Sequence, residues 1–594
     1  MKMEGSKFLK VSLLLLLGTS YLSPSLSTEI TSQVFGFDSQ ILPAAFGDFN
    51  SDELTDLFVL RDNSTTVEIL LGSNEATPLL KAANLKCTLK SCSITSVVPG
   101  DFNGDALMDV LLTVKCPGTQ SINLDVHILW GVQNSLNCTI NEKIPILTMK
   151  GEALAIDSNN DFIIDLFGVH GNGTWGTWFF NNNSHPVFEE FAIPKHYKMR
   201  DPHSNAYLDL NNDNTADLFL TVQSQDKYIF EEYRGQRKSS KFSYYSQYSA
   251  PTQAKRKLGQ SIFLDLELKG KMNHVVPILD KTNPKIMVGD RTGWRNLNVD
   301  FKKDEKTWYF LESGLPFSKT VNLRGGDYNM DGYPDLLATL TSGAINRTFL
   351  LENVPCHSGC DNFTRTFQIQ WDGFTKDLND SVDGVFYDIF QNGILDVILI
   401  RQYQNGTYHV SAIKNNLDYD ANFIKVMVLT GLTNKNVTRT RMGARKNAFG
   451  TNLPGPRVAY RTVDQDGFLR TGVSAQIPQS AHYALNLPYI MFALGRTPNF
   501  VDNITVGFAS QERDLLQVIP NSQMVVIPNQ IDNPSRWKVQ LFVTPSKIIV
   551  LSGMALVGTC FVIILIILYL HWKEKKLDKL ERLQEAHRFN FDAM

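Results

Sequence analysis

Gly100-Asp-Phe-Asn-Gly-Asp-Ala-Leu-Met-Asp-Val110 decides the fold, because its pattern recurs along most of the 594-residue chain. Asp101, Asn103, Asp105 and Asp109 occupy positions one, three, five and nine of a short loop. Carboxylate and amide oxygens with this spacing are typical ligands of a hard cation. The stretch therefore predicts a repeated turn that is also a candidate metal site.

The loop pattern returns at regular intervals. Its other full copies are Asp48, Asn50, Asp52, Asp56; Asp157, Asn159, Asp161, Asp165; Asp209, Asn211, Asp213, Asp217; and Asp327, Asn329, Asp331, Asp335. Asp388, Asn392 and Asp396 make a weaker copy, and Asp265 followed by Asn273 a degenerate one. The seven starts are separated by 53, 56, 52, 56, 62 and 61 residues. A period of this size is typical of a repeat architecture.

Short apolar runs follow the loops. Val110–Val114 has the length of a strand and is followed, after a polar gap, by a second run at Val126–Trp130. A unit of about 50 residues with about four strands matches a propeller blade better than a helical or leucine-rich repeat. Seven units would close a ring and remove the exposed sheet edges. We therefore expect an all-β, seven-bladed β-propeller over residues 28–418.

Phe46-Gly47-Asp48-Phe49-Asn50 and its sister sequences resemble the FG-GAP repeats of integrin α-subunit propellers. From leader to tail, the chain resembles the T-cell immunomodulatory protein (Linkin) family of single-pass surface proteins. The resemblance implies an adhesion or immunomodulatory protein, with modulation of T-cell function and cytosolic contacts with RuvB-like ATPases and tubulin. Integrin-style ligand capture is not implied, because the chain has no identifiable inserted metal-dependent domain.

The N-terminus has the pattern of a secretory signal peptide. Lys2, Lys7 and Lys10 precede the apolar run Val11–Leu17, which is too short to cross a bilayer. We expect residues 1–27 to be removed. Residues 28–545 would then lie outside the cytoplasm, in an oxidising compartment.

Sequons and cysteines agree with this location. Ten Asn-x-Ser/Thr sequons occur, at Asn63, Asn137, Asn172, Asn182, Asn346, Asn362, Asn379, Asn405, Asn436 and Asn503. Six of the seven cysteines precede the C-terminal apolar run, an even number that indicates disulfides. We expect nearest neighbours to pair: Cys87 with Cys92, Cys116 with Cys138, and Cys356 with Cys360. Six cysteines permit fifteen connectivities, so pairing is the weaker part of the prediction.

The composition changes after residue 418. Strand-like runs without the acidic loop predict a separate β-sandwich over residues 419–545: Phe423–Leu429, Arg457–Val463, Tyr489–Leu494, Ile504–Phe508, Met524–Ile527 and Trp537–Val543. Ile548–Leu570 then gives 23 residues without a charged side chain. As a helix it would be about 34 Å long, enough to span a bilayer.

Residues 546–570 are therefore a predicted transmembrane helix. Lys573, Lys575 and Lys576 follow the span and place the tail, residues 571–594, in the cytoplasm. The chain would be a type I protein of the plasma membrane. In the tail, Leu577, Leu580 and Leu583 make a helical stripe, which fits either a continuation of the membrane helix or a docking helix for a cytosolic protein.

The acidic loops carry 17 of the chain's 60 Asp and Glu residues as candidate ligands. Four side-chain oxygens, one carbonyl and a water or bidentate carboxylate reach the six to eight oxygens that Ca²⁺ prefers. Mg²⁺ demands a tighter octahedron, and transition metals favour His or Cys ligands, which the loops lack. The alternative is a metal-free turn whose carboxylates cap backbone amides. The pattern predicts structural, not catalytic, calcium.

Signals of catalysis are weak. Gly171-Asn-Gly-Thr-Trp-Gly176 fits a dinucleotide-binding pattern but opens no predicted helix, and the 11 His residues are scattered. The net charge of −3 gives no support for nucleic-acid binding. We therefore expect no enzyme. Two alternatives stay open: a lumenal trafficking or client-binding receptor, and an extracellular enzyme with its active site at the central channel of the propeller.

Overall fold

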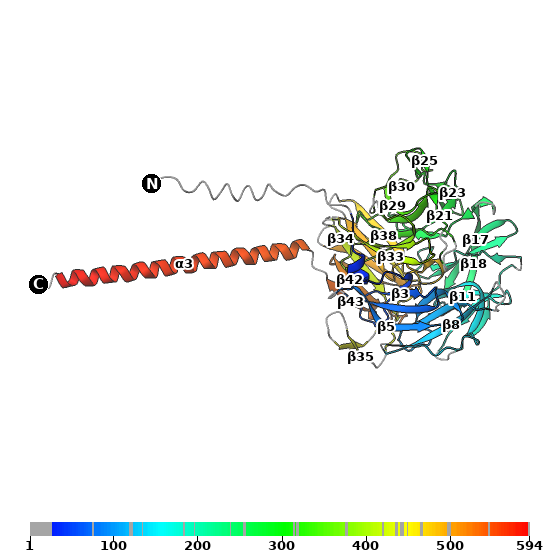
Figure 1. The fold of residues 1–594 in the computed structure, drawn as a ribbon, viewed down its shortest axis with the longest axis horizontal. Coiled ribbons are helices and arrows are strands. Elements are labelled where there is room, and N and C mark those ends of the chain that lie inside the picture. Colours follow the sequence, from blue (N-terminus) through cyan, green and yellow to red (C-terminus); the bar gives the residue numbers. More distant parts are fainter. Residues whose placement is uncertain are drawn as a thin grey trace. The chain divides into compact units, whose positions relative to one another are not determined.

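The computed structural model describes residues 27–591 apart from 74–76, 118–122, 134, 182–184, 195, 238, 254–256, 313–314, 316–319, 373, 375–377, 418–420, 434–436, 440–444, 448, 464–466, 496–499 and 544–546. The chain divides into two units, one up to Phe542 and one from Val543 to Met594. The first unit is built of strands and the second is mainly one helix (Figure 1). The expected signal peptide lies outside the described residues, except for Ser27.

Antiparallel meanders follow one another through the first part of the chain. The first is β2 (Leu42–Gly47), β3 (Asp56–Arg61), β4 (Thr66–Gly72) and β5 (Leu80–Thr88). The second is β6 (Ser93–Gly100), β7 (Asp109–Lys115), β8 (Asn123–Val132) and β9 (Ser135–Asn137). The third is β10 (Leu147–Ile156), β11 (Asp165–His170), β12 (Trp175–Phe179) and β13 (Val187–Glu190). Pairing of β8 with β10 joins the second and third meanders into one sheet.

The later meanders follow the same plan. The fourth is β14 (Lys198–Met199), β15 (Ala206–Leu208), β16 (Asp217–Ser224), β17 (Lys227–Gln236) and β18 (Ser239–Gln253). The fifth is β19 (Lys257–Leu258), β20 (Ile262–Leu264), β21 (Asn273–Leu279), β22 (Lys285–Asp290) and β23 (Gly293–Asn296). A two-stranded pair, β24 (Lys302–Lys303) and β25 (Lys306–Thr307), follows it. The sixth meander is β26 (Tyr309–Phe310), β27 (Arg324–Gly326), β28 (Asp335–Thr341), β29 (Asn346–Pro355) and β30 (Arg365–Gln370).

The last meander is completed by the N-terminus. Its own strands are β31 (Ser381–Tyr387), β32 (Asp396–Gln402) and β33 (Tyr408–Asn415). β1 (Ser27–Glu29) pairs antiparallel with β33, and the short helix α2 (Thr31–Phe35) packs on the same strand. β2 also contacts β33. The beginning and the end of the repeat region are therefore held together by backbone hydrogen bonds.

Two further sheets follow in the C-terminal region. One has the order β39-β34-β42-β43, from β34 (Asn422–Val428), β39 (Ile490–Gly495), β42 (Ser522–Ile527) and β43 (Lys538–Val543). The other has the order β38-β37-β40-β41, from β37 (Arg457–Val463), β38 (Leu469–Ala475), β40 (Val501–Phe508) and β41 (Gln511–Val518). Both sheets contribute to one buried cluster that includes Tyr460, Phe492 and Trp537. Each strand predicted here from the sequence is confirmed, and the hairpin β35 (Val437–Arg439) and β36 (Arg445–Asn447) is additional.

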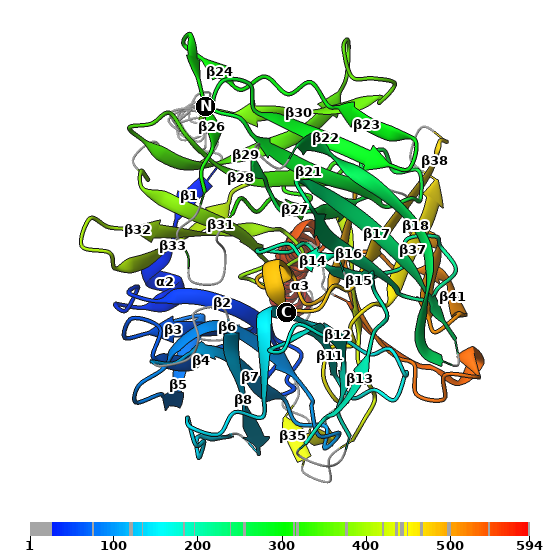
Figure 2. The same cartoon turned by 90° about the vertical axis from the view of Figure 1, so that its right-hand side faces the viewer.

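Residues 476–488, between β38 and β39, leave these two sheets and run among the meanders. They contain a short 3-10 helix, η1 (Ala481–Tyr483), which is buried. Phe46 of β2 donates its backbone N–H to Gln479 Oε1 at 3.1 Å, and Ala155 of β10 donates to Ser480 Oγ at 2.9 Å. We call residues 478–487 the insert. Figure 2 shows the meanders arranged around this central part of the molecule.

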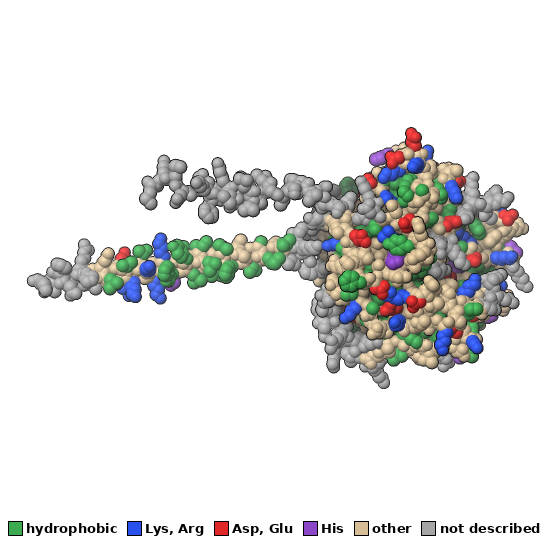
Figure 3. Space-filling view, in the orientation of Figure 1, with side chains coloured by type: hydrophobic (Ala, Val, Ile, Leu, Met, Phe, Trp, Pro, Cys, Tyr) green, Lys and Arg blue, Asp and Glu red, His purple; other side chains and the backbone are tan. Residues whose placement is uncertain are grey.

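The second unit consists mainly of α3 (Lys547–Phe591), a continuous helix of 45 residues. It contains a stretch long and apolar enough to cross a membrane. Figure 3 shows that stretch in green, followed by blue Lys and Arg side chains near its C-terminal end. The helix runs without a break from the predicted span into the tail, as expected for a continuation of the membrane helix.

Two of the three expected disulfide pairings are wrong. Cys87 pairs with Cys138, and Cys92 pairs with Cys116. Cys92 and Cys116 directly flank the antiparallel pair β6–β7, so strand pairing brings them together. Cys87 lies on β5, which contacts β9, and Cys138 follows β9. Contacts between strands, rather than proximity along the chain, therefore decide these bridges, and Cys87–Cys138 joins the first meander to the second.

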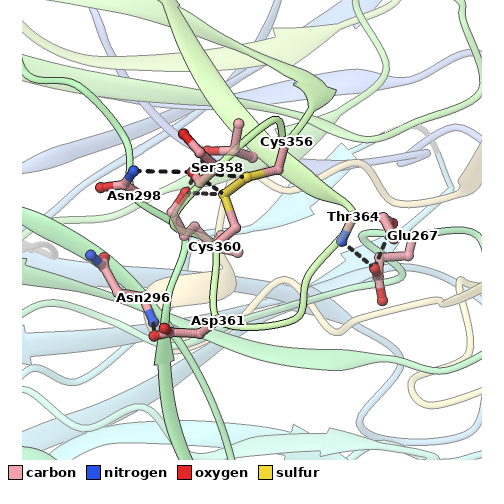
Figure 4. Close-up of a disulfide and its surroundings, with 10 residues drawn as sticks. Glu267, Asn296, Asn298, Cys356, Ser358, Cys360, Asp361 and Thr364 are labelled. Carbon is pink, nitrogen blue, oxygen red and sulfur yellow. Dashed lines mark hydrogen bonds between the residues drawn. A yellow bond between two sulfur atoms is a disulfide. The ribbon is translucent and has the colours of Figure 1, made fainter.

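The third pairing, Cys356 with Cys360, is confirmed. It closes a short loop between β29 and β30 that rests on the fifth meander (Figure 4). Asn296 donates its backbone N–H to Asp361 Oδ2 at 3.0 Å, and Thr364 donates its backbone N–H to Glu267 Oε1 at 2.8 Å. This disulfide loop therefore helps to connect two neighbouring repeats.

Candidate metal-binding loops

Every predicted loop lies at the same place in its meander, between the strand that precedes its first Asp and the strand that begins at its ninth residue. Positions four and six of each loop have positive φ. These positions are Ser51 and Glu53, Gly104 and Ala106, Asn160 and Phe162, Asn212 and Asn214, Leu268 and Gly270, Met330 and Gly332, and Gln391 and Gly393. Non-glycine residues in this region cost free energy, so the rest of the loop must hold them there.

The first and ninth carboxylates hold that backbone. In the first loop, Asp48 accepts from the backbone N–H groups of Asp52 at 3.0 Å and Glu53 at 2.9 Å. Asp56 accepts from the N–H groups of Phe49 at 2.7 Å and Gly72 at 2.8 Å. The same pattern recurs in the second loop, where Asp101 and Asp109 replace Asp48 and Asp56. The loop motif therefore has a structural use with or without a metal.

The degenerate fifth loop keeps this architecture. Asp265 accepts from the N–H groups of Lys269 at 2.9 Å and Gly270 at 2.7 Å. Asn273 takes the ninth position and accepts from the N–H of Leu266 at 3.3 Å. The first carboxylate and an amide at the ninth position thus hold the turn, and carboxylates at positions five and nine are not needed for it.

Burial of these carboxylates disfavours their ionised form. Desolvation, followed by repulsion from Asp161, raises the pKa of Asp157 to about 8, and desolvation and Asp157 raise the pKa of Asp165 to about 9. Desolvation also raises the pKa of Asp48 and Asp56 well above the usual range. Ionised carboxylates at these positions require a nearby positive charge.

Some loops obtain that charge from the protein. In the fourth loop, Arg234 forms an ion pair with Asp217, and Arg457 Nε lies 3.8 Å from Asp209 Oδ2. In the fifth, Lys269 pairs with Glu267 at 2.7 Å. In the sixth, Arg365 Nη2 lies 3.8 Å from Asp331 Oδ2. The sequence pattern gave no indication of Arg234 or Arg457, because both lie outside the loops.

Other loops do not. Within the described part of the chain, no Lys or Arg forms an ion pair with the Asp side chains at positions one, five and nine of the first and third loops. In the described part of the chain, four buried carboxylate oxygens of the loops have no hydrogen-bond partner: Asp157 Oδ1, Asp165 Oδ2, Asp327 Oδ1 and Asp396 Oδ2. An oxygen-rich, buried and uncompensated pocket is the donor chemistry that Ca²⁺ prefers.

The side chains as placed do not converge on one point. Among the residues that the structure describes, no group of three or more His, Cys, Asp or Glu is arranged as a metal site. In the first loop, for example, Asn50 Nδ2 donates to Asp52 Oδ2 at 3.0 Å. An ion would have to replace this contact and turn both oxygens inward. The residue types and burial fit calcium, and the hydrogen bonds within the loops also fit turns whose carboxylates cap backbone amides.

The loops also meet the C-terminal region. Asn214 Nδ2 donates to Glu512 Oε2 at 2.9 Å, and Arg457 Nη1 donates to Asn214 Oδ1 at 3.3 Å. Arg470 Nη1 donates to the carbonyl oxygen of Asp331 at 3.1 Å. Lys425 Nζ donates to Gln391 Oε1 at 2.6 Å. The acidic loops of the fourth, sixth and last repeats therefore form part of the surface on which the C-terminal sheets rest.

The insert is a second cluster that the sequence did not reveal. Arg324 of β27 donates from Nη1 to the carbonyl oxygens of His482 at 3.2 Å and Ala484 at 2.7 Å, and from Nη2 to Asp383 Oδ2 at 3.4 Å. His482 Nε2 lies 3.0 Å from the carbonyl oxygen of Ser261. Arg324 and Asp383 are buried. The sequence offered no signal for this cluster beyond the charge of Arg324 directly before Gly325-Gly326.

The sequons differ in exposure. Asn63, Asn137, Asn172, Asn362 and Asn405 are exposed, Asn346, Asn379 and Asn503 are partly buried, and Asn182 and Asn436 lie outside the described residues. Asn503 Nδ2 donates to Asp514 Oδ1 at 3.1 Å, and Asn379 Oδ1 accepts from Arg347 Nε at 2.6 Å. The exposed group is the better substrate for a glycosyltransferase.

Two family models match parts of the chain. Residues 29–112 match an FG-GAP-like repeat, and residues 448–542 match "ITFG1, C2 domain". Together with the meanders, the acidic loops and the apolar C-terminal helix, these matches define an all-β FG-GAP repeat protein that has one candidate membrane helix among its described residues.

Relatives extend over almost the whole chain. The T-cell immunomodulatory protein of Mus musculus is 38% identical over 95% of this chain and 94% of its own length. Protein linkin of Caenorhabditis elegans is 28% identical over 93% of this chain and 95% of its own. A T-cell immunomodulatory protein homolog of Plasmodium falciparum is 26% identical over 91% of this chain and 86% of its own length. The chain belongs to the T-cell immunomodulatory protein family.

Proposed function

We propose that the chain is a type I membrane glycoprotein of the cell surface that acts through protein contacts in adhesion or immunomodulation. Its outer part would be a closed seven-bladed propeller, stabilised by calcium in some of its loops, followed by a β-sandwich. α3 would anchor it in the plasma membrane, with the helical tail in the cytoplasm. The cytosolic contacts with RuvB-like ATPases and tubulin that the family resemblance implies belong to that tail and remain part of the proposal.

Closure of the propeller is supported by the ends of the repeat region. β1 supplies the outer strand of the last meander, and β2 packs beside β33. Neighbouring first strands also touch, as in β2 with β6, β10 with β15, β20 with β27 and β27 with β31. A ring closed by a strand from the opposite end leaves no open first or last blade.

Calcium is supported most strongly in the first and third loops. The carboxylates at their first and ninth positions are buried, have raised pKa values and form no ion pair with the protein's described cations. Bound Ca²⁺ would keep them ionised and would link the two strands that each loop joins. The fourth loop has less need of an ion, because Arg234 and Arg457 lie against Asp217 and Asp209.

The insert is the observation that favours a role in protein contacts over a role in catalysis. A propeller enzyme would place its chemistry at the central channel, but residues 478–487 occupy the middle of the meanders. Arg324, Asp383 and His482, three of the charged and titratable groups found there, are buried and bonded to each other or to backbone carbonyls. Outer surfaces and loops therefore remain for contact with partners.

Surface labelling tests this function against a lumenal trafficking receptor. Cells expressing the full chain with a C-terminal tag are treated with a membrane-impermeant biotin reagent, and the tagged chain is recovered. We expect biotinylated chain whose mass falls on treatment with N-glycosidase. A peroxidase fused after residue 28 should then label a reproducible set of surface proteins. A chain that stays unlabelled and keeps only immature glycans would favour the lumenal receptor instead.

A further inference from the structure

Exposed apolar side chains gather at one end of the C-terminal region. Those exposed by more than a third are Val463, Phe468, Leu469, Phe500, Leu516 and Ile519, with exposed fractions of 38, 70, 53, 41, 72 and 51%. We call these six residues the apolar end. Between residues 422 and 542, the only other described large apolar side chain so exposed is Leu541 of β43. Scattered exposed apolar residues are ordinary, but a group of them indicates a contact surface.

Strand register places the six residues together. Val463 of β37 lies opposite Leu469 of β38, at the turn that joins these strands. β37 runs antiparallel to β40, so that turn lies at the end of the sheet where β40 begins, next to Phe500. Val501 pairs with Val518, which precedes Ile519. The apolar end is thus formed by the turn β37–β38 and by the start of β40 and the end of β41.

The chain also leaves the C-terminal region on the side of the apolar end. Arg513, near the start of β41, donates from Nη1 to the carbonyl oxygens of Pro534 at 3.3 Å, Ser535 at 3.4 Å and Trp537. β43 therefore begins at the end opposite the apolar end. β42 starts three residues after Ile519 and ends at that opposite end. Because β43 pairs with β42 and starts where β42 ends, it must run back toward the apolar end.

The connection from β43 to the membrane helix is short. β43 ends at Val543 and α3 begins at Lys547. Four residue steps can span at most about 14 Å. A bilayer that holds α3 must therefore begin close to the point where β43 ends, and this point lies on the side of the apolar end.

We propose that the apolar end inserts into the interfacial layer of the same bilayer that anchors α3. Phe468, Leu469 and Leu516 would enter the boundary between head groups and acyl chains, as apolar side chains on peripheral surfaces do. The C-terminal sheets would then be seated on the membrane rather than free on a tether. This proposal rests on the membrane anchor of the proposed function.

Site-directed fluorescence in nanodiscs tests the proposal on the full chain. Native Cys560 within α3, the free cysteine, is labelled with an environment-sensitive dye in one sample. In a second, Phe468→Cys is labelled in a Cys560→Ser background. In a matched control, Val187→Cys, which is 61% exposed in the third meander, replaces Phe468→Cys. Each is reconstituted in phosphatidylcholine nanodiscs with and without lipids that carry a doxyl quencher. For positions 468 and 187 the quencher lies near the head group, and for Cys560, near the middle of the apolar stretch, it lies near the end of the acyl chain.

We expect the quencher to reduce emission at least twofold for the labels at Cys560 and at position 468, and to leave the label at position 187 unchanged. A further variant carries the dye at Ile519→Cys together with the substitutions Phe468→Ser/Leu469→Ser/Leu516→Ser. Its dye should lose most of the quenching, while the melting temperature of the protein stays the same. Quenching at Cys560 without quenching at 468 overturns this inference alone, whether that end is free or covered by a protein. Loss of quenching at Cys560 overturns the membrane anchor itself.

Discussion

Chelating calcium from the proposed secreted part of the chain, residues 28–542, should lower its melting temperature by about 3 °C at neutral pH. A site at tenfold saturation adds about 1.4 kcal/mol to the free energy of unfolding, and the first and third loops together would add about 3 kcal/mol. The measurement is a thermal melt in the presence of calcium and again after dialysis against EDTA. Protease resistance should fall in parallel.

The size of that effect should depend on pH. Without calcium, Asp157 and Asp165 have pKa values of about 8 and about 9 in the folded chain, above the ordinary value of about 4. The folded chain then binds more protons than the unfolded chain, so its stability falls as the pH rises from about 4 to about 9. Bound calcium keeps both carboxylates ionised and offsets this fall. The difference between the calcium and EDTA melts should be larger at pH 8.5 than at pH 6.

A matched pair of variants separates calcium from turn formation. Asp157→Asn/Asp165→Asn should remove part of the EDTA effect, because amides bind Ca²⁺ weakly. Asp209→Asn/Asp217→Asn should leave it unchanged, because Arg234 and Arg457 already serve that loop. Identical melts with calcium and EDTA at pH 8.5 would mean that the carboxylates act as metal-free caps.

Arg324→Met should destabilise the secreted part by about 3–5 kcal/mol, the usual cost of leaving one member of a buried ion pair alone. It leaves Asp383 without its cation and the carbonyl oxygens of His482 and Ala484 without their donor. We expect a marked fall in the denaturation midpoint, or retention of the variant in the secretory pathway. The measurement is chemical denaturation of the secreted protein together with its yield.

Two controls test the reason for this effect. Arg237→Met removes an exposed pair with Asp532, in which the side chains are 37% and 74% exposed, and should cost less than about 1 kcal/mol. Arg324→Met/Asp383→Leu should recover only part of the loss, because the insert carbonyls stay unpaired. An Arg324→Met chain as stable as the Arg237→Met chain would contradict the role of the insert as a structural centre.

The sequence was most informative where chemistry and spacing coincide. Asp48 and Asp56 act through backbone amides of their own loop and of Gly72 at the end of β4, so the nine-residue loop pattern carries the local structure with it. The apolar runs after each loop became β3, β7, β11, β16, β28 and β32 for the same reason. Even Asp265 in the fifth repeat keeps the turn, although its neighbours diverged.

Long-range packing between sheets could not be predicted from the repeat pattern of the sequence. Cys87 and Cys92 are near in sequence but belong to different meanders, so their true partners depend on which strands meet. Arg457 reaches the fourth loop from a region more than 240 residues away, and the insert has no periodicity that would indicate its position. Such contacts arise from the arrangement of whole sheets and leave only isolated charged residues as a trace.

The calcium content of the secreted chain tests the central claim most directly. After equilibrium dialysis against a calcium-containing buffer, elemental analysis by mass spectrometry of the protein compartment and of the buffer counts the ions bound per chain. The account predicts at least two, with one lost in Asp48→Asn/Asp56→Asn, another in Asp157→Asn/Asp165→Asn, and none in Asp209→Asn/Asp217→Asn. A content equal to the buffer blank in the unaltered, folded chain would contradict it.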